Sequence, residues 1–221
     1  MSPNYEINKL AKEESWRMFR ILGEFVDGFD VLSQVEPAIT IYGSARVKPE
    51  DKLYQTAKTI ARGLAQRGFS ILTGGGPGIM EAANQGALEA GANSVGLHIR
   101  LPTQENINPY TTISITFKYF FVRKVMLVKY ASAFILMPGG WGTLDELFET
   151  ITLIQTQKIK PFPVILYDSA HWQGLMQWME QTLCGKGFVS HPDLGLFHVV
   201  DEPEQVFHIV EAWQRDNLSK D

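Results

Sequence analysis

Three glycine-containing segments are the residues whose type and spacing point most directly to chemistry. They are Gly43-Ser44-Ala45-Arg46, Thr73-Gly74-Gly75-Gly76-Pro77-Gly78 and Pro138-Gly139-Gly140-Trp141-Gly142-Thr143. Each follows an apolar run and precedes a helical pattern. Where a strand gives way to a helix, free backbone N–H groups and the positive end of the helix dipole attract an anion, and glycine lets a phosphate approach. One sharp turn could need glycine without any ligand, but three such turns predict a site for a phosphorylated small molecule.

Two charged side chains lie close to these segments in the sequence. Glu146 comes three residues after Thr143, a spacing that also fits a capping box, in which both side chains bond to the start of a helix. A carboxylate beside a phosphate site repels the ligand unless it serves the reaction, so we expect Glu146 to be catalytic. Arg123 lies in an apolar helical run and needs an anionic partner, either the reacting site or a structural ion pair at a subunit contact. Lys124 points about 100° away from it on the same helix.

Several familiar ligands do not fit these patterns. A dinucleotide fingerprint would need G-x-G-x-x-G after the first strand, and a triphosphate-binding loop would need a glycine followed by Lys-Ser or Lys-Thr; neither occurs. The five histidines have no metal-ligand spacing, so no metal is expected. No lysine lies in the glycine segments for a Schiff base with pyridoxal phosphate, and we expect no cofactor.

The elements that must position these residues alternate along the chain. Short apolar runs predict strands at 38–42, 69–72, 94–99, 111–117, 133–137, 163–167 and 197–200. Helical patterns fill 13–35, 51–67, 79–90, 120–130, 144–155, 172–183 and 203–213. Apolar strands separated by helices predict an α/β fold, a Rossmann-like doubly wound parallel sheet, with residues 1–221 forming a single domain. In such folds ligands bind at the carboxyl ends of the strands, where all three glycine segments are expected.

Composition limits the partners. With 20 basic against 24 acidic residues the net charge is −4, so we expect no polymeric nucleic acid and no anionic membrane as a partner. The single cysteine, Cys184, favours a reducing compartment. The first twenty residues carry charges throughout and lack the apolar core of a signal peptide, and no run is apolar enough to span a membrane. We therefore expect a cytoplasmic protein.

The same segments carry a resemblance to a known family. The run Gly74-Gly75-Gly76-x-Gly-Ile-Met, the pair Arg123-Lys124 and the run Pro138-Gly-Gly-Trp-Gly-Thr-Leu-Asp-Glu146 resemble the LOG (Lonely guy) family of nucleoside 5′-monophosphate phosphoribohydrolases, whose members were long labelled "possible lysine decarboxylase". The resemblance covers roughly residues 38–183. It implies hydrolysis of the N-glycosidic bond of AMP or of an N6-substituted adenine nucleotide to free base, an active cytokinin in plants, and ribose 5-phosphate. It also implies a homo-oligomer, at least a dimer, in which a neighbouring subunit helps to build each site.

The resemblance assigns roles to individual positions. It implies that Arg123 and Glu146 are catalytic, with Glu146 stabilising an oxocarbenium-like transition state and orienting or deprotonating the attacking water. The positions that it implies for substrate binding are Gly43, Ser44, Gly74, Gly75, Gly76, Met80, Glu105, Lys124, Gly139, Gly140, Trp141, Gly142, Thr143 and Thr152. Glu105 could instead be a solvated loop charge, and Thr152 a hydroxyl on a helix surface. Glu81 replaces a glycine of the short plant members, which leaves the preferred base open.

Two other readings of the sequence compete with this one. A similar fold with similar glycine loops is found in molybdenum-cofactor carriers, which bind a phosphorylated pterin without hydrolysis and have no need of the Arg123–Glu146 pair. A nucleosidase with broad specificity for monophosphates is the second alternative.

Two helical segments bear on assembly. The apolar run 117–128 is too apolar for a solvated surface, and we expect Val125 and Val128 on its exposed face to form a subunit contact. On the amino-terminal helix, Trp16, Phe19, Phe25 and Phe29 are expected to pack in the core or to cover a neighbouring subunit.

Overall fold

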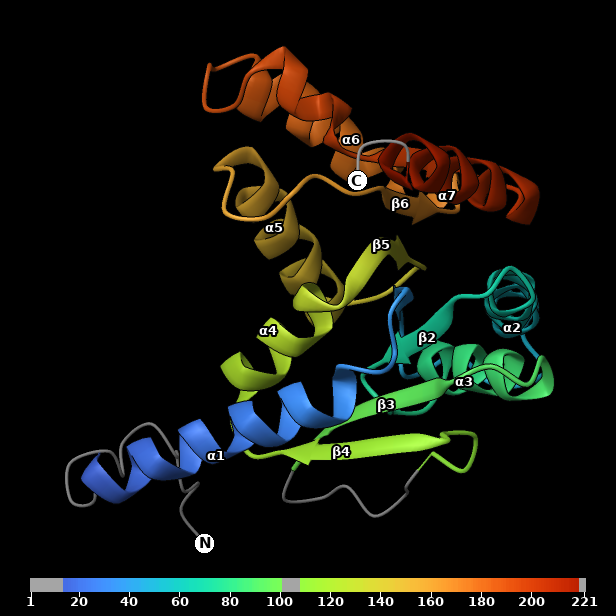
Figure 1. Ribbon diagram of the computed structural model, residues 1–221. Helices are drawn as coiled ribbons and strands as arrows, with labels where there is room; N and C mark the ends of the chain where they lie inside the picture. The colour runs from blue at the N-terminus through green and yellow to red at the C-terminus, as the bar shows by residue number, and fades with distance from the viewer. Residues whose placement is uncertain (1–13, 101–107, 219–221) are drawn as a thin grey trace, which may run out of the picture.

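A parallel sheet of seven strands runs through the computed structural model, which describes residues 14–100 and 108–218 (Figure 1). The strand order is β4-β3-β2-β1-β5-β6-β7, and every neighbouring pair is parallel. The order runs outward from β1 on one side and from β5 on the other, which confirms the predicted doubly wound fold. The strands are β1 (Ala38–Tyr42), β2 (Ser70–Thr73), β3 (Ser94–Ile99), β4 (Ile113–Phe117), β5 (Ala131–Leu136), β6 (Val164–Tyr167) and β7 (His198–Val200).

Helices cover both faces of this sheet. One face carries α2 (Lys52–Ala65), α3 (Ile79–Glu89) and α7 (Pro203–Leu218), and the other α1 (Glu14–Leu32), α4 (Phe120–Lys129), α5 (Trp141–Gln155) and α6 (Ser169–Trp178) (Figure 1). After α6 the chain continues as a π-helical stretch, Met179–Cys184, and a 3-10 helix, His191–Leu196. Two apolar clusters, one on each face, form the core. Because both faces are covered, β1, β2, β3 and β6 are buried along their whole length.

The sheet explains why the glycine segments meet. They follow β2, β1 and β5, which are adjacent strands, and β1 is paired with β5 up to Tyr42 and Leu136 at their carboxyl ends. The strand order reverses between β1 and β5, and ligands bind at this point in doubly wound folds. Sequence reasoning therefore placed the three segments at one edge correctly.

Helix α1 differs from its expectation. Trp16 and Phe19 are 72% and 67% exposed, Phe29 is also exposed, and only Phe25 of the four aromatic residues packs against the core. The expectation that all four lie in the core is wrong, and the alternative that this helix covers a neighbouring subunit stays a prediction. The reason is that α1 lies alongside α4 and away from the centre of the sheet, so that only one side of the helix is covered (Figure 1).

One contact of α1 fixes the start of α4. The carboxylate of Glu24 accepts hydrogen bonds from the backbone N–H groups of Lys118 (2.9 Å) and Tyr119 (3.2 Å). Tyr119 is the residue that precedes α4, and its own side chain makes no capping bond. Glu24 thus supplies from another helix the acceptor that a capping side chain would provide. This places Arg123, which lies one turn into α4.

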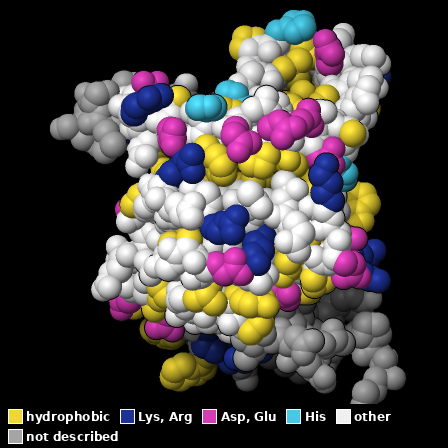
Figure 2. Space-filling model, turned by 90° about the vertical axis from the view of Figure 1, so that its right-hand side faces the viewer, with side chains coloured by type: hydrophobic (Ala, Val, Ile, Leu, Met, Phe, Trp, Pro, Cys, Tyr) yellow, Lys and Arg dark blue, Asp and Glu magenta, His cyan; other side chains and the backbone are white. Residues whose placement is uncertain are grey.

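The face of the molecule that Figure 2 shows is of mixed charge. On the side that carries α2 and α3, basic and acidic side chains are interspersed (Figure 2). Within residues 14–100 and 108–218, no helix has the length and apolarity needed to cross a membrane.

Candidate active site

Ser44 joins the three glycine loops. Its backbone N–H donates to the carbonyl of Pro138 in the third loop (3.0 Å), and its carbonyl accepts from the N–H of Ile79 after the second loop (3.0 Å). Its hydroxyl accepts from the N–H of Arg46, which closes the first loop on itself (3.1 Å). The three loops therefore form one hydrogen-bonded unit at the carboxyl ends of β2, β1 and β5.

The second loop needs glycine at defined positions. Gly75 and Gly78 have φ of 69° and 70°, a region that side chains with a Cβ rarely adopt. A Cβ on Gly78 would also collide with the carbonyl oxygen of Ser44 in the first loop. The glycines thus allow the close approach of the two loops, and the N–H of Gly75 is held by the hydroxyl of Thr73 (3.0 Å).

The third loop leads into α5 without a capping box. Helix α5 begins at Trp141, after Gly140, and no side chain caps it. The alternative that Thr143 and Glu146 form a capping box is therefore wrong. Instead, the Thr143 side chain lies against Gly139. The N–H groups of Trp141 and Gly142 have no acceptor in the described part of the chain, as an anion site at a helix start requires.

Arg123 reaches the second loop from α4. Its guanidinium Nη2 lies directly against the α-carbon of Gly74, where a Cβ would collide with it. The sulfur of Met80 lies on the same side of Gly74, and its terminal methyl group faces Gly76. Burial lowers the pKa of Arg123, while Glu146 opposes this. Arg123 makes no ion pair with any described residue, so the described part of the chain does not supply the anionic partner expected from the sequence.

Glu146 lies in the second turn of α5 and is only 8% exposed. Burial raises the pKa of its carboxyl to about 7; Lys124 and Arg123 lower it, while Glu149 and Asp145 raise it. Its Oε2 is buried and has no hydrogen-bond partner in the described structure. A carboxyl group with such a pKa is partly ionised at neutral pH and can accept a proton there.

Lys124 lies between α4 and α5 and forms ion pairs with both Asp145 (2.9 Å) and Glu149 (2.8 Å). These pairs hold α4 against α5 and so fix Arg123 and Glu146 relative to each other. The predicted contact of Lys124 with substrate stays a prediction.

Three residues of this region lie outside the glycine motifs, and the sequence did not lead us to predict them. Tyr42 is the last residue of β1, His98 lies near the end of β3, and Thr150 lies one turn after Glu146 on α5. All three are buried, and Tyr42 Oη, His98 Nε2 and Thr150 Oγ1 have no partner among the described residues. Tyr42 and His98 lie near the carboxyl ends of strands, and Thr150 lies four residues after Glu146. These positions were the hint in the sequence that the three residues belong to the site.

The imidazole of His98 lies against Gly75 and Gly96. Burial and the nearby charge of Arg123 lower its pKa, so the ring is neutral at neutral pH. A second histidine, the exposed His171 at the start of α6, accepts a bond from the N–H of Gly139 (3.4 Å). Histidines therefore border both the second and the third loop.

One predicted site residue, Thr152, is not brought to this cluster. Thr152 is exposed on another side of α5, and its hydroxyl donates to the carbonyl of Phe148 (2.7 Å). Glu105 lies outside the described residues. Both assignments stay predictions.

Within the described ranges, no group of three His, Cys, Asp or Glu side chains could hold a metal ion.

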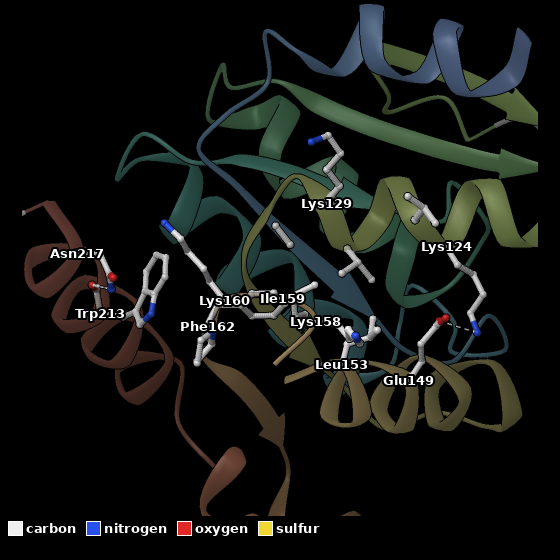
Figure 3. A pocket seen from close by; sticks show the side chains of 14 residues that line it. Lys124, Lys129, Glu149, Leu153, Lys158, Ile159, Lys160, Phe162, Trp213 and Asn217 are labelled. Carbon is white, nitrogen blue, oxygen red and sulfur yellow. Dashed lines mark hydrogen bonds and ion pairs between the residues drawn. The ribbon is translucent and has the colours of Figure 1, made fainter. Parts of the chain in front are cut away.

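A groove of about 1040 Å³ opens beside the cluster, between α4, α5, α7 and the 158–162 segment (Figure 3). Lys129, Lys158 and Lys160 supply basic side chains, and Phe162 and Trp213 supply aromatic rings. Neither Arg123 nor Glu146 lines it. The groove is thus a neighbour of the candidate active site, separated from it by the Lys124–Glu149 ion pair that Figure 3 shows at its edge.

Comparison with known proteins identifies the class to which this fold and site belong. Residues 80–210, more than half of the chain, match the family described as "Possible lysine decarboxylase". The chain belongs to this family, which is the LOG family that the glycine motifs resemble.

The chain is similar to a cytokinin riboside 5′-monophosphate phosphoribohydrolase of Mycobacterium marinum, with 28% identity over 74% of this chain and 87% of that protein. A protein of the same name from Arabidopsis thaliana is 27% identical over 85% of this chain and 82% of its own length.

Two solved structures share the fold. The X-ray structure of TM1055 has a TM-score of 0.61 and 24% identity, over 79% of this chain and 98% of that one. The molybdenum cofactor binding protein from Rippkaea orientalis has a TM-score of 0.58 and 23% identity, over 79% and 94%.

Proposed function

We propose that this protein hydrolyses the N-glycosidic bond of purine nucleoside 5′-monophosphates, AMP or N6-substituted AMP, to free base and ribose 5-phosphate. The observation that carries the proposal is the buried carboxyl of Glu146 on the helix that follows the third glycine loop, which interacts electrostatically with Arg123 at the second loop. The names of the curated relatives support it. The single cysteine of the sequence agrees with a reaction in the reducing cytoplasm.

In the proposed reaction the glycine loops bind the 5′-phosphate, and the free N–H groups of Trp141 and Gly142 are its donors. A water molecule attacks C1′ while the bond from C1′ to the base nitrogen breaks and its electron pair leaves with the base. Glu146 takes the proton of the water and stabilises the positive charge that develops on the ribose. The proton ends on the released base, so no other reactant is needed. Arg123 holds the nucleotide against Gly74.

The proposal is tested by incubating the protein with AMP, GMP, CMP, isopentenyl-AMP and adenosine, and measuring the free base by chromatography. We expect base from AMP or isopentenyl-AMP and none from adenosine, because binding of the remote phosphate supplies the energy that holds the ribose for attack. Equal turnover of adenosine would contradict the role of the glycine loops. Comparable rates with all three unmodified monophosphates would favour the broad nucleosidase.

A carrier of a phosphorylated cofactor is the second candidate, because solved structures with this fold include a molybdenum cofactor binding protein. A carrier has no use for a buried carboxyl with a raised pKa. Tight binding of molybdopterin together with no release of base from any nucleotide would favour the carrier.

The proposal includes assembly into a dimer or a larger oligomer through α4. Phe120, Phe121 and Val125 are 57%, 47% and 43% exposed, and Val125 also lines the groove between α4, α5 and α7. Apolar side chains gathered on one exposed helix are typical of a subunit contact. Val128 does not belong to this surface, contrary to expectation, because it is buried against the core.

A further inference from the structure

Several buried polar atoms on β1, α4 and α5 have no hydrogen-bond partner within residues 14–100 and 108–218. They include the Tyr42 hydroxyl, Arg123 Nε, Glu146 Oε2 and Thr150 Oγ1. Protein interiors satisfy nearly all such atoms, either with protein groups or with ordered water that makes two to four hydrogen bonds. Tyr42 interacts electrostatically with both Glu146 and Arg123, so the first three groups lie near one another. Thr150, four residues after Glu146, lies on the same side of α5.

Tyr42 is held firmly in this region by its ring. The ring is 6% exposed and packs edge-on against Phe134, with 5.1 Å between ring centroids. Burial raises the pKa of the hydroxyl well above its usual value, and the negative charge of Glu146 adds to this. The hydroxyl therefore stays protonated and can act as a donor throughout the pH range of the proposed reaction.

No direct hydrogen bond joins the Tyr42 hydroxyl to Glu146 Oε2, yet both atoms are buried and lack a hydrogen-bond partner among the described residues. A single water molecule could accept from Tyr42 and donate to the carboxylate, and the Thr150 hydroxyl offers it a third partner. A donor to the ionised form of a carboxylate favours that form.

We propose that Tyr42 is a positioning residue for Glu146, whose hydroxyl stabilises and orients the ionised carboxylate through a shared buried water molecule. This rests on the proposed function for its effect on catalysis, but its effect on the carboxyl group is independent of substrate. The other charged groups that face Glu146 are Arg123 and Lys124 from α4, and Asp145 and Glu149 from α5 itself. Tyr42 is the group contributed by the sheet.

The test is the Tyr42→Phe variant, which keeps the ring and its packing on Phe134 and removes only the hydroxyl. Loss of the donor should move the titration of Glu146 to higher pH by about one unit. Because the ionised form is the proposed base, the acid limb of the rate against pH should move by the same amount, with kcat lowered more at pH 6 than at pH 9. KM for AMP should stay unchanged.

A direct readout follows the carboxyl carbon of Glu146 by NMR in protein labelled with ¹³C-glutamate, using Glu146→Gln to assign the signal. Tyr130→Phe is the matched control, because it also removes a buried hydroxyl, one that bonds to Phe29 away from the site. We expect the titration to move in Tyr42→Phe and to stay in place in Tyr130→Phe.

An unchanged titration in folded Tyr42→Phe would overturn the inference. If that variant does not fold, fluorinated tyrosine at position 42, a more acidic phenol of nearly the same shape, should move the titration to lower pH, and no movement would again overturn it. Failure of the proposed function is distinguishable: the unmodified protein would then release no base, while the carboxyl titration would still respond to the Tyr42 hydroxyl.

Discussion

The guanidinium of Arg123 lies directly against the α-carbon of Gly74, so the helix α4 and the second glycine loop touch at a point where no Cβ fits. Gly74→Ala should therefore displace Arg123 and lower the rate of base release at least tenfold, a loss of about 1.4 kcal/mol of transition-state stabilisation. The measurement is kcat/KM with AMP.

Gly174→Ala is the control for this variant, because an added Cβ there meets no atom within 4 Å. It should leave the rate unchanged. Full activity in Gly74→Ala would show that the contact of Arg123 with this loop is not needed for the reaction.

Glu146→Gln tests the chemistry. The amide keeps the size of the side chain but cannot take a proton from water, so base release should fall by roughly 10²- to 10⁴-fold. Glu89→Gln, which alters a surface ion pair with Lys58 and a hydrogen bond from Gln85, should behave like the unmodified protein. Unchanged turnover in Glu146→Gln would falsify the catalytic assignment.

The same substitution has a second effect, on stability. Burial raises the pKa of Glu146 from 4.5 to about 7, so the folded state resists ionisation that the unfolded state accepts. The unmodified protein therefore loses stability as the pH rises from 4.5 through 7, by up to about 3 kcal/mol, and Glu146→Gln does not. Urea unfolding at pH 5 and pH 8 should show the variant gaining relative stability at pH 8. A pH-independent difference would contradict the raised pKa.

Glu24 should matter for both stability and activity. Glu24→Ala removes the acceptor from two backbone N–H groups at the start of α4, which should cost about 1–3 kcal/mol of the free energy of unfolding. It should also lower kcat, because the turn that carries Arg123 is loosened. Glu24→Gln keeps one acceptor oxygen and should lose less of both. Equal losses of stability and of kcat in the two variants would show that the Glu24 side chain does not act as a hydrogen-bond acceptor.

Assembly is tested at Val125. Val125→Asp should place a charge in the proposed subunit contact, cost several kcal/mol of association and abolish both assembly and activity. Leu88→Asp, on the opposite side of the sheet and similarly exposed at 41%, is the control and should leave both unchanged. Light scattering after size-exclusion chromatography gives the mass, and a fully active monomer of 24.9 kDa would refute the proposed contact.

The sheet and its loops could be predicted because the signal is local: apolar runs mark buried strands, and glycine marks the turns that follow. Glu146 and Arg123 could be singled out because a carboxylate close to a predicted phosphate site and an arginine in an apolar helical run are both unusual. Tyr42 could not be predicted, because a tyrosine at the end of a strand is common. Its proposed role depends on the interaction with Glu146 of α5, which only the fold reveals. Thr150 could not be told from Thr152 without knowing which side of α5 faces the sheet.

The orientation of α1 was equally inaccessible. The apolar pattern of α1 predicts a helix whose apolar side chains must be covered. The pattern does not show whether the sheet, α4 or another subunit covers them. Glu24 gave no signal because its partners lie more than 90 residues further along the chain. Long-range contacts of this kind appear only after the sheet has brought the elements together.

Ser44 commits both its backbone N–H and its carbonyl to the neighbouring loops. Hydrogen bonds thereby link three turns that are separate in the sequence, and none of the turns can reorient without breaking a bond to another. In the proposed reaction the phosphate meets loops whose backbone is already fixed by these bonds, and the entropy of ordering the loops is lost during folding and not during each encounter. The rate at which the loops accept a nucleotide should consequently be set by diffusion and steering, without a slow rearrangement of the backbone.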